Sequence, residues 1–269
     1  MFVHAGLFYV FLLFLYIKTV RYLFAFFDTI FIAYIGKGWA LIMGIDPKRI
    51  KEILVANEVT QLYHANTVVT SLTFLRSGGL LSRGYVEDIN APQTSQQTDD
   101  SDKDLGIYYD IFFDATDIHQ QARNLNFYGP VSFVYSIDVL DHPNIEVKVT
   151  KRNPQYWASN QDEAERYFLD ESELEFCYNP KDFGQHITIC DMHAPLPFIP
   201  YLQKIIMDDP QIEDNKYFVQ AVSVMQKELV RQGIVAPLCI RECPEDCKCH
   251  KAYREHKEGY VYHRFKTKL

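Results

Sequence analysis

Two glutamates, Glu173 and Glu175, are separated by a single residue in the segment Glu173-Leu174-Glu175-Phe176-Cys177-Tyr178. The alternation of acidic and apolar residues predicts a strand that carries both carboxylates on one face. A carboxylate in this position can stabilise the oxocarbenium-like cation that forms when a glycosidic bond breaks. The pair is therefore a candidate catalytic site, although a half-exposed strand with two glutamates on its solvent face shows the same pattern.

A second group of chemically versatile residues lies between Leu62 and Arg83. A short apolar strand ends near His64, an apolar-periodic helix follows, and the pair Gly78-Gly79 ends that helix. The glycines can supply a positive φ and a close backbone approach. We expect His64 to present both ring nitrogens to a ligand, and Arg83 to face an anion.

This strand-His-helix-GGLLSR run resembles the opening of the DarT family of DNA ADP-ribosyltransferases, where an early histidine holds the nicotinamide-ribose part of NAD. The family's late strand carries a catalytic glutamate, and Leu174-Glu175-Phe176 lies at the corresponding place. The resemblance implies that NAD is bound by a set of residues from the first motif, namely His64, Asn66, Thr67, Gly79 and Leu80. It also implies that Glu175 stabilises the ribosyl cation, and that Glu173 orients the acceptor.

The middle of the chain departs from the family pattern, because no Pro-Arg-Ser-Pro-Met-like run follows its aromatic strand. Arg83 and Arg123 are both candidates for the catalytic loop arginine of the family. A helix capped by Asp114 or Thr116 would carry His119 on its polar face, where it could contact the acceptor. His186 begins an apolar strand and is interpreted as a structural histidine.

The resemblance implies an NAD-dependent mono-ADP-ribosyltransferase that modifies a base in single-stranded DNA. Such toxin-like enzymes are commonly paired with an antitoxin-like hydrolase that reverses the mark. An alternative acceptor is a protein side chain, which the Glu173-x-Glu175 pair favours. A further alternative is a non-catalytic protein that binds zinc and a partner.

The tail of the chain carries cysteines with the spacing C-x3-C-x3-C-x-C-H: Cys239, Cys243, Cys247 and Cys249. These four thiolates, or three of them with a histidine, could hold a structural zinc ion. The cysteines could also have a redox or disulfide role, or be incidental. Because no secretory signal is recognised, a reducing cytoplasmic setting fits better than a disulfide framework. The surrounding lysines, arginines and tyrosines make the tail locally basic and aromatic, as in single-strand nucleic-acid binders.

The pattern of apolar residues predicts an α+β fold. The resemblance implies that residues 43–235 form an ADP-ribosyltransferase-like mixed β core with flanking helices. We expect strands at 60–64, 107–113, 131–137, 145–150, 173–178 and 186–190. We expect helices at 47–57, 66–77, 115–124, 161–168, 198–207 and 215–232. The polar segment 91–104 is interpreted as a mobile loop, either a substrate flap or a tolerated insertion.

Residues 1–42 are apolar and aromatic, and the Cys/His-rich tail occupies 236–269. Residues 2–35 could form a membrane-associated hairpin, buried helices, or sequence outside the working protein, since neither apolar run alone reaches the length of a bilayer span. The chain has 269 residues, a formal net charge of −8 and 48% hydrophobic residues. This acidic balance argues against nucleic-acid binding driven by overall charge.

Overall fold

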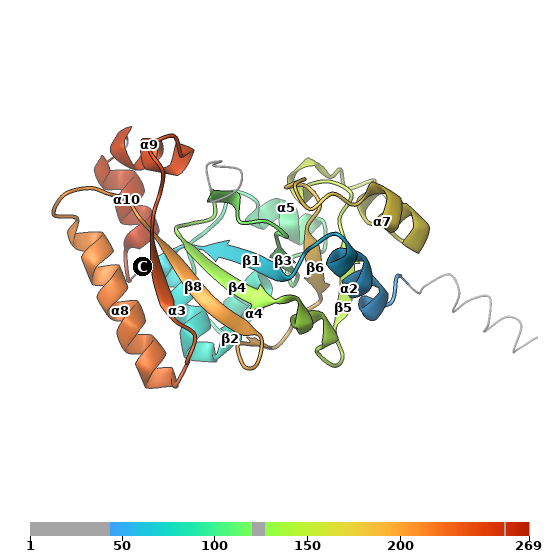
Figure 1. Ribbon diagram of the computed structural model, residues 1–269, viewed down its shortest axis with the longest axis horizontal. Helices are drawn as coiled ribbons and strands as arrows, with labels where there is room; N and C mark the ends of the chain where they lie inside the picture. Colours follow the sequence, from blue (N-terminus) through green and yellow to red (C-terminus); the bar gives the residue numbers. More distant parts are fainter. Residues whose placement is uncertain (1–43, 120–126, 256, 269) are drawn as a thin grey trace, which may run out of the picture. The chain divides into compact units, whose positions relative to one another are not determined.

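The computed structural model describes residues 44–119, 127–255 and 257–268, and Ile45–Leu269 form one compact unit (Figure 1). The predicted mixture of sheets and helices is confirmed. Residues 1–42, where a membrane hairpin was one expectation, and Arg123 lie outside the described residues. Within the described part of the chain, no helix is both long and apolar enough to cross a bilayer.

The strands form a four-stranded, a three-stranded and a two-stranded sheet. The first has the order β1-β4-β8-β9, with β1 (Gln61–Asn66), β4 (Val131–Ser136), β8 (Leu202–Asp209) and β9 (Leu238–Glu242). The second has the order β3-β6-β5, with β3 (Ile111–Phe113), β6 (Ile187–Cys190) and β5 (Glu146–Val149). The smallest sheet pairs β2 (Gly79–Leu80) with β7 (Leu196–Pro197). All pairs are antiparallel except β8 and β9.

The two larger sheets meet where Tyr63 of β1 pairs with Asp114, just after β3. Their backbone groups exchange two hydrogen bonds of 2.9 Å each. Buried aromatic rings fill the space behind this junction, and Phe133 stacks on Phe198 with ring centroids 5.6 Å apart. The junction therefore fixes the end of β1 against the end of β3.

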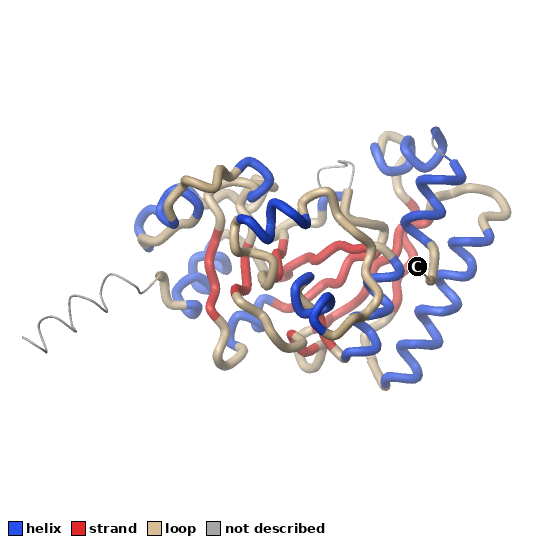
Figure 2. Tube along the Cα trace, turned by 180° about the vertical axis from the view of Figure 1, so that it is seen from behind, coloured by secondary structure: helices blue, strands red, loops and turns tan. Residues whose placement is uncertain are grey.

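The longer helices begin and end at residues suited to those positions. Asp46 caps α2 (Pro47–Ala56), whose first residue is a proline. Gly78 ends α3 (Val68–Ser77) with φ of 72°. Helix α8 (Lys216–Gln232) begins at Asn215, whose side chain accepts two backbone hydrogen bonds. The remaining helices are α4 (Arg83–Asp88), α5 (Asp99–Asp104), α6 (Glu163–Arg166), α7 (Glu171–Cys177), α9 (Lys248–Glu255) and α10 (Lys257–Phe265), with short 3₁₀ turns η2 (Ile137–Asp141) and η3 (Pro154–Tyr156). Seen from behind, the strands lie in the middle of the unit with helices at either end (Figure 2).

Two predicted elements are wrong. Residues 173–177 belong to α7, because Asp170 caps that helix through the backbone N–H of Glu173 and the acidic first turn favours the helix dipole. Leu174 is buried but Phe176 is 90% exposed, which a strand with one buried face would not show. Residues 198–207, predicted as a helix, lie mostly in β8, a largely buried strand between β4 and β9.

The Cys/His-rich tail packs into the same core as the rest of the unit. Cys243, Cys247, Cys249, Tyr253 and Phe265 are all buried. Helix α10 lies against α8, α9 and α3. The tail is thus a wall of the folded unit.

Candidate active site

A cavity of about 910 Å³, including the space that opens to solvent, lies where the ends of β1 and β3 meet. Its polar wall includes side chains from four separate segments: His64, Arg83, Asp114 and His186. The segment 91–104 also lines it through Gln96 and Asp102.

His64 is held in one orientation by the backbone of the neighbouring sheet. Its Nδ1 lies 2.9 Å from the carbonyl oxygen of Phe112 and therefore donates the hydrogen. Burial lowers the pKa of His64, so the ring is neutral at neutral pH. Its Nε2 is left as a buried acceptor with no hydrogen-bond partner among the described residues. The expectation that both ring nitrogens are available is wrong, since only Nε2 is.

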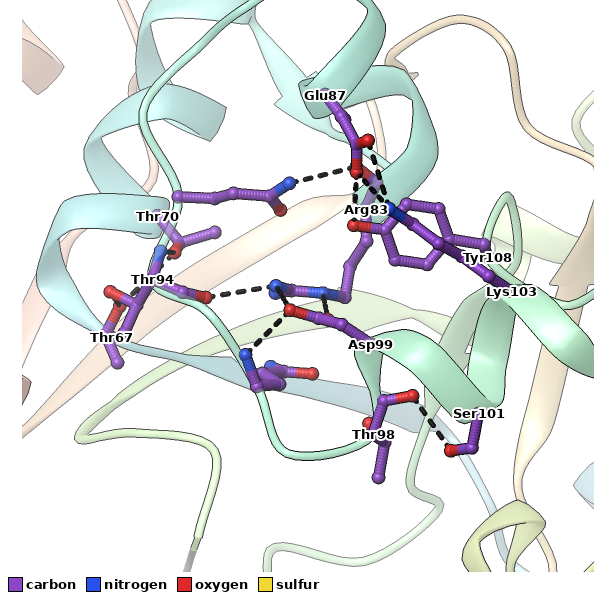
Figure 3. Close-up of polar contacts among 12 residues, drawn as sticks. Thr67, Thr70, Arg83, Glu87, Thr94, Thr98, Asp99, Ser101, Lys103 and Tyr108 are labelled. Atoms are coloured by element: carbon purple, nitrogen blue, oxygen red, sulfur yellow. Dashed lines mark hydrogen bonds and ion pairs between the residues drawn. The ribbon is translucent and has the colours of Figure 1, made fainter.

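Arg83 ties the segment 91–104 to the core. Its guanidinium forms an ion pair with Asp99, and its Nη2 donates a hydrogen bond of 3.1 Å to the carbonyl oxygen of Thr94 (Figure 3). Gln93 donates to the Arg83 carbonyl at 3.1 Å. Nη1 of Arg83 is buried without a hydrogen-bond partner among the described residues. The segment read as a mobile loop is therefore anchored, and α5 forms its second half.

The predicted NAD-binding residues divide into two groups. Asn66 and Thr67 lie at the cavity and the groove beside it. Gly79 and Leu80 form β2 and contribute to the lining of neither. A Cβ at Gly79 would lie 2.2 Å from the carbonyl oxygen of Leu196, so this glycine permits close approach of β7 rather than of a ligand.

His186 and Asp114 form a polar pair on the cavity wall. Nδ1 of His186 lies 3.1 Å from Oδ1 of Asp114. The backbone of Asp114 is fixed by Tyr63, and the backbone N–H of His186 donates to Thr150 Oγ1 at 2.7 Å. A carboxylate at Nδ1 holds an imidazole in the tautomer whose Nε2 can accept a proton. His186, which was expected to have a structural role, thus also lines the cavity.

Two further carboxylates face the cavity. Burial raises the pKa of Asp110 to about 7, and it also raises the pKa of Asp102. Asp110 is held by a hydrogen bond of 2.9 Å from the backbone N–H of Asp191. A carboxyl group that titrates near neutral pH can donate or accept a proton during a reaction.

The predicted pairing of His64 with Glu175 around one cavity is wrong. Glu175 lies on α7, beside α2 (Figure 1), where it forms an ion pair with Arg49. Glu173, the expected acceptor-binding residue, lies 2.5 Å from Lys151 Nζ. Neither glutamate lines the cavity or the adjoining groove. Their roles in the chemistry have no geometric support.

His119 and the tail cysteines also differ from expectation. His119 is buried and contacts Cys243 and Cys249 rather than the cavity. Cys239 lies on β9 and belongs to neither group of side chains that could hold a metal among the described residues. Cys239 thus lies apart from the other three predicted cysteine ligands, and metal binding by the tail stays a prediction.

A wider groove adjoins the cavity and shares Asn66, Asp114 and His186 with it. The tail contributes a basic and aromatic wall to this groove: Lys248, Tyr260, His263 and Arg264. The guanidinium of Arg264 stacks on the Tyr260 ring at 4.2 Å from its centroid. The cavity and the groove thus share part of their wall, and the tail makes one side of the groove basic.

No protein-family model matches this chain, and no curated protein does. Solved structures of DarT are similar to it. DarT from Thermus sp. 2.9 in complex with ADP-ribosylated ssDNA is 15% identical, with a TM-score of 0.43, over 68% of this chain and 95% of that one. The same protein in complex with NAD+ is 14% identical, with a TM-score of 0.43, over 68% and 96% of the two chains. Its complex with carba-NAD+ gives 14% identity, a TM-score of 0.41 and the same coverage.

The cavity includes residues whose importance the sequence did not signal. Asp110 and Asp114 flank β3, whereas His186 precedes β6 far along the chain, so no local spacing links the histidine to the two carboxylates. One weak signal exists: Asp110 interrupts the aromatic run Tyr108-Tyr109-Asp110-Ile111-Phe112-Phe113. A carboxylate between large apolar residues often marks a site where burial changes its pKa.

Proposed function

We propose that the cavity binds NAD and that the protein transfers ADP-ribose from it to an acceptor. The observation that carries the proposal is the convergence of a neutral His64, Arg83 and the Asp114–His186 pair on one cavity. NAD has ribose hydroxyls that donate hydrogen bonds, and carboxamide and phosphate oxygens that accept them. The polar atoms of this cavity complement both kinds.

His64 and Arg83 bind and orient the dinucleotide in this proposal. Nε2 of His64 accepts a hydrogen bond from a ribose hydroxyl, because the ring is neutral and Nδ1 is already engaged with Phe112. Nη1 of Arg83 donates to an oxygen of the dinucleotide. The bound dinucleotide thus supplies hydrogen-bond partners to Nε2 of His64 and Nη1 of Arg83, which burial separates from water.

Asp114 and His186 carry the chemistry in this proposal. The bond between the nicotinamide nitrogen and ribose C1′ breaks, and its electron pair leaves with nicotinamide, which becomes neutral. Asp114 places its carboxylate charge near the cation that develops at C1′. The acceptor then forms a bond to C1′, and its proton passes to Nε2 of His186. The products are nicotinamide, the ADP-ribosylated acceptor and a proton.

Single-stranded DNA is the proposed acceptor. The groove that opens from the cavity carries Lys248, His263 and Arg264 beside exposed or half-exposed aromatic rings. Cations contact the phosphate backbone and aromatic rings stack on unpaired bases, which is how single strands are bound without a duplex. The groove is basic although the chain as a whole has a net charge of −8.

The test uses labelled NAD and a set of single-stranded oligonucleotides that differ in base composition. We expect His186→Ala to lose transfer to DNA while the Asp114 carboxylate still supports slow hydrolysis of NAD. Asp114→Asn should lose both reactions. Glu175→Gln is the matched control, since this carboxylate lies on α7. If Glu175→Gln abolishes transfer and His186→Ala leaves it intact, the assignment of the chemistry to the cavity is refuted.

A further inference from the structure

Three cysteines of the tail and one histidine from the middle of the chain meet in the interior of the unit. Cys243, Cys247, Cys249 and His119 are each no more than 3% exposed. Cys249 Sγ lies 3.2 Å from Nε2 of His119, and Cys243 Sγ lies 3.6 Å from Nδ1 of the same ring. None of these cysteines forms a disulfide.

Three ligand atoms of this cluster lie within the separations that a metal ion requires. The ligand atoms of His119, Cys247 and Cys249 lie within 4.8 Å of one another. Cys243 belongs to a second group, with His119 and Asp208, and its Sγ lies beside Nδ1 of the ring rather than Nε2. In a tetrahedral zinc site with Zn–S of about 2.3 Å and Zn–N of about 2.0 Å, ligand atoms lie roughly 3.5 to 4 Å apart.

The surroundings of His119 support a ligand role for its ring. Nδ1 of His119 lies 2.9 Å from Oδ2 of Asp208, a buried residue at the end of β8. Arg241 of β9 donates to Oδ1 of Asp208 at 2.8 Å and also forms an ion pair with Asp117. A carboxylate beside one ring nitrogen of a histidine commonly directs the other nitrogen to a metal.

We propose that Nε2 of His119 and the thiolates of Cys247 and Cys249 hold a zinc ion. Asp208 orients the histidine, and Cys239, the fourth ligand expected from spacing alone, takes no part. Two thiolates and one imidazole are three of the four ligands of a tetrahedral zinc shell. The ion fastens the start of α9 to the segment that follows β3.

The first test measures metal bound to the full chain, purified with zinc and reductant and then dialysed. We expect about one zinc ion per chain. His119→Ala and Cys247→Ser should each lose most of it. Cys239→Ser and Cys177→Ser are matched controls, because both residues are cysteines outside the cluster, and they should keep it. Loss of zinc in Cys239→Ser with retention in His119→Ala would overturn the proposed ligand set.

A second test needs no variant and therefore does not depend on whether a cluster variant folds. Cobalt introduced in place of zinc into the wild-type chain should give the intense visible bands of a tetrahedral site and thiolate-to-cobalt charge transfer. Thiol titration of the native chain should leave Cys247 and Cys249 unreacted, and removal of the metal by a strong chelator should make them reactive. A folded wild-type chain with almost no zinc and no cobalt bands would refute the site.

Discussion

The ion pair between Arg83 and Asp99 fixes the segment 91–104 against the cavity, and the substitution Asp99→Asn tests it. The two side chains are only 14% and 19% exposed. Asp99 accepts hydrogen bonds from Arg83 and, at 2.9 Å, from the backbone N–H of Gln96. Asparagine has nearly the same shape, so the change removes the charge and one of the two acceptor oxygens while keeping the packing.

The expected loss follows from the burial of the pair. Removing one partner of a buried ion pair costs about 3–5 kcal/mol when the remaining charge is fully buried. Arg83 keeps its bond to the Thr94 carbonyl and some contact with solvent, and asparagine still accepts one hydrogen bond. We therefore expect the segment to be destabilised by about 2 kcal/mol, near the value for one hydrogen bond to a charged group.

Limited proteolysis measures this loss directly. Lys103 lies on α5 within the segment, so trypsin cleaves after it when the segment opens. If opening is local and fast, a loss of about 2 kcal/mol raises the cleavage rate by about 30-fold. Asp100→Asn is the matched control, because Asp100 is exposed on the same helix. Equal cleavage rates for the Asp99 variant and the control would show that the ion pair does not hold the segment.

Other predictions concern the cavity, a close backbone approach and the groove. Burial raises the pKa of Asp110 to about 7, so the free energy of unfolding falls as the pH rises from about 4 to 7. In denaturant titrations, Asp110→Asn should therefore raise the free energy of unfolding by a few kcal/mol at pH 8 but not at pH 4. Asp191→Asn, at an exposed position, is the control and should have little effect at either pH. Gly79→Ala should lower the free energy of unfolding in urea by about 3 kcal/mol or more, because the added Cβ would collide with Leu196. Gly259→Ala, whose added Cβ meets nothing within 4 Å, should be neutral or slightly stabilising. Equal effects of the two substitutions would refute the collision. Arg264→Ala and Lys248→Ala should each weaken binding to single-stranded DNA and lower its salt dependence. Lys227→Ala on α8 is the control and should change neither. Equal salt slopes for all three variants would argue against DNA binding in this groove.

Local signals explain what the sequence predicted well. The caps and glycines around α2 and α3 act within a few residues, and they fixed these helices to within two residues of their bounds. The strands β1, β4, β5 and β6 were also located, because each is a short apolar run between turn residues.

The failures have equally local causes. The alternation at 173–178 predicted a strand, but the cap at Asp170 decided the outcome in favour of a helix. The run Ile205-Ile206-Met207 is too short for its period to distinguish helix from buried strand, and its position between β4 and β9 decided for a strand. The candidate site could not be found in the same way, since Asp114 and His186 meet only through the pairing of β3 with β6.

The segment from Asp114 to His119 connects the two candidate sites of the unit. Asp114 faces the cavity beside His186, and five residues later His119 reaches the cysteine cluster. The far end of that cluster begins α9, whose Lys248 lines the groove next to the cavity. A metal ion held by this cluster would therefore position two parts of the cleft at once, the carboxylate at its inner end and the basic wall at its entrance. On this argument, removal of the metal should lower the affinity for DNA and the rate of transfer together, although none of the metal ligands touches either substrate.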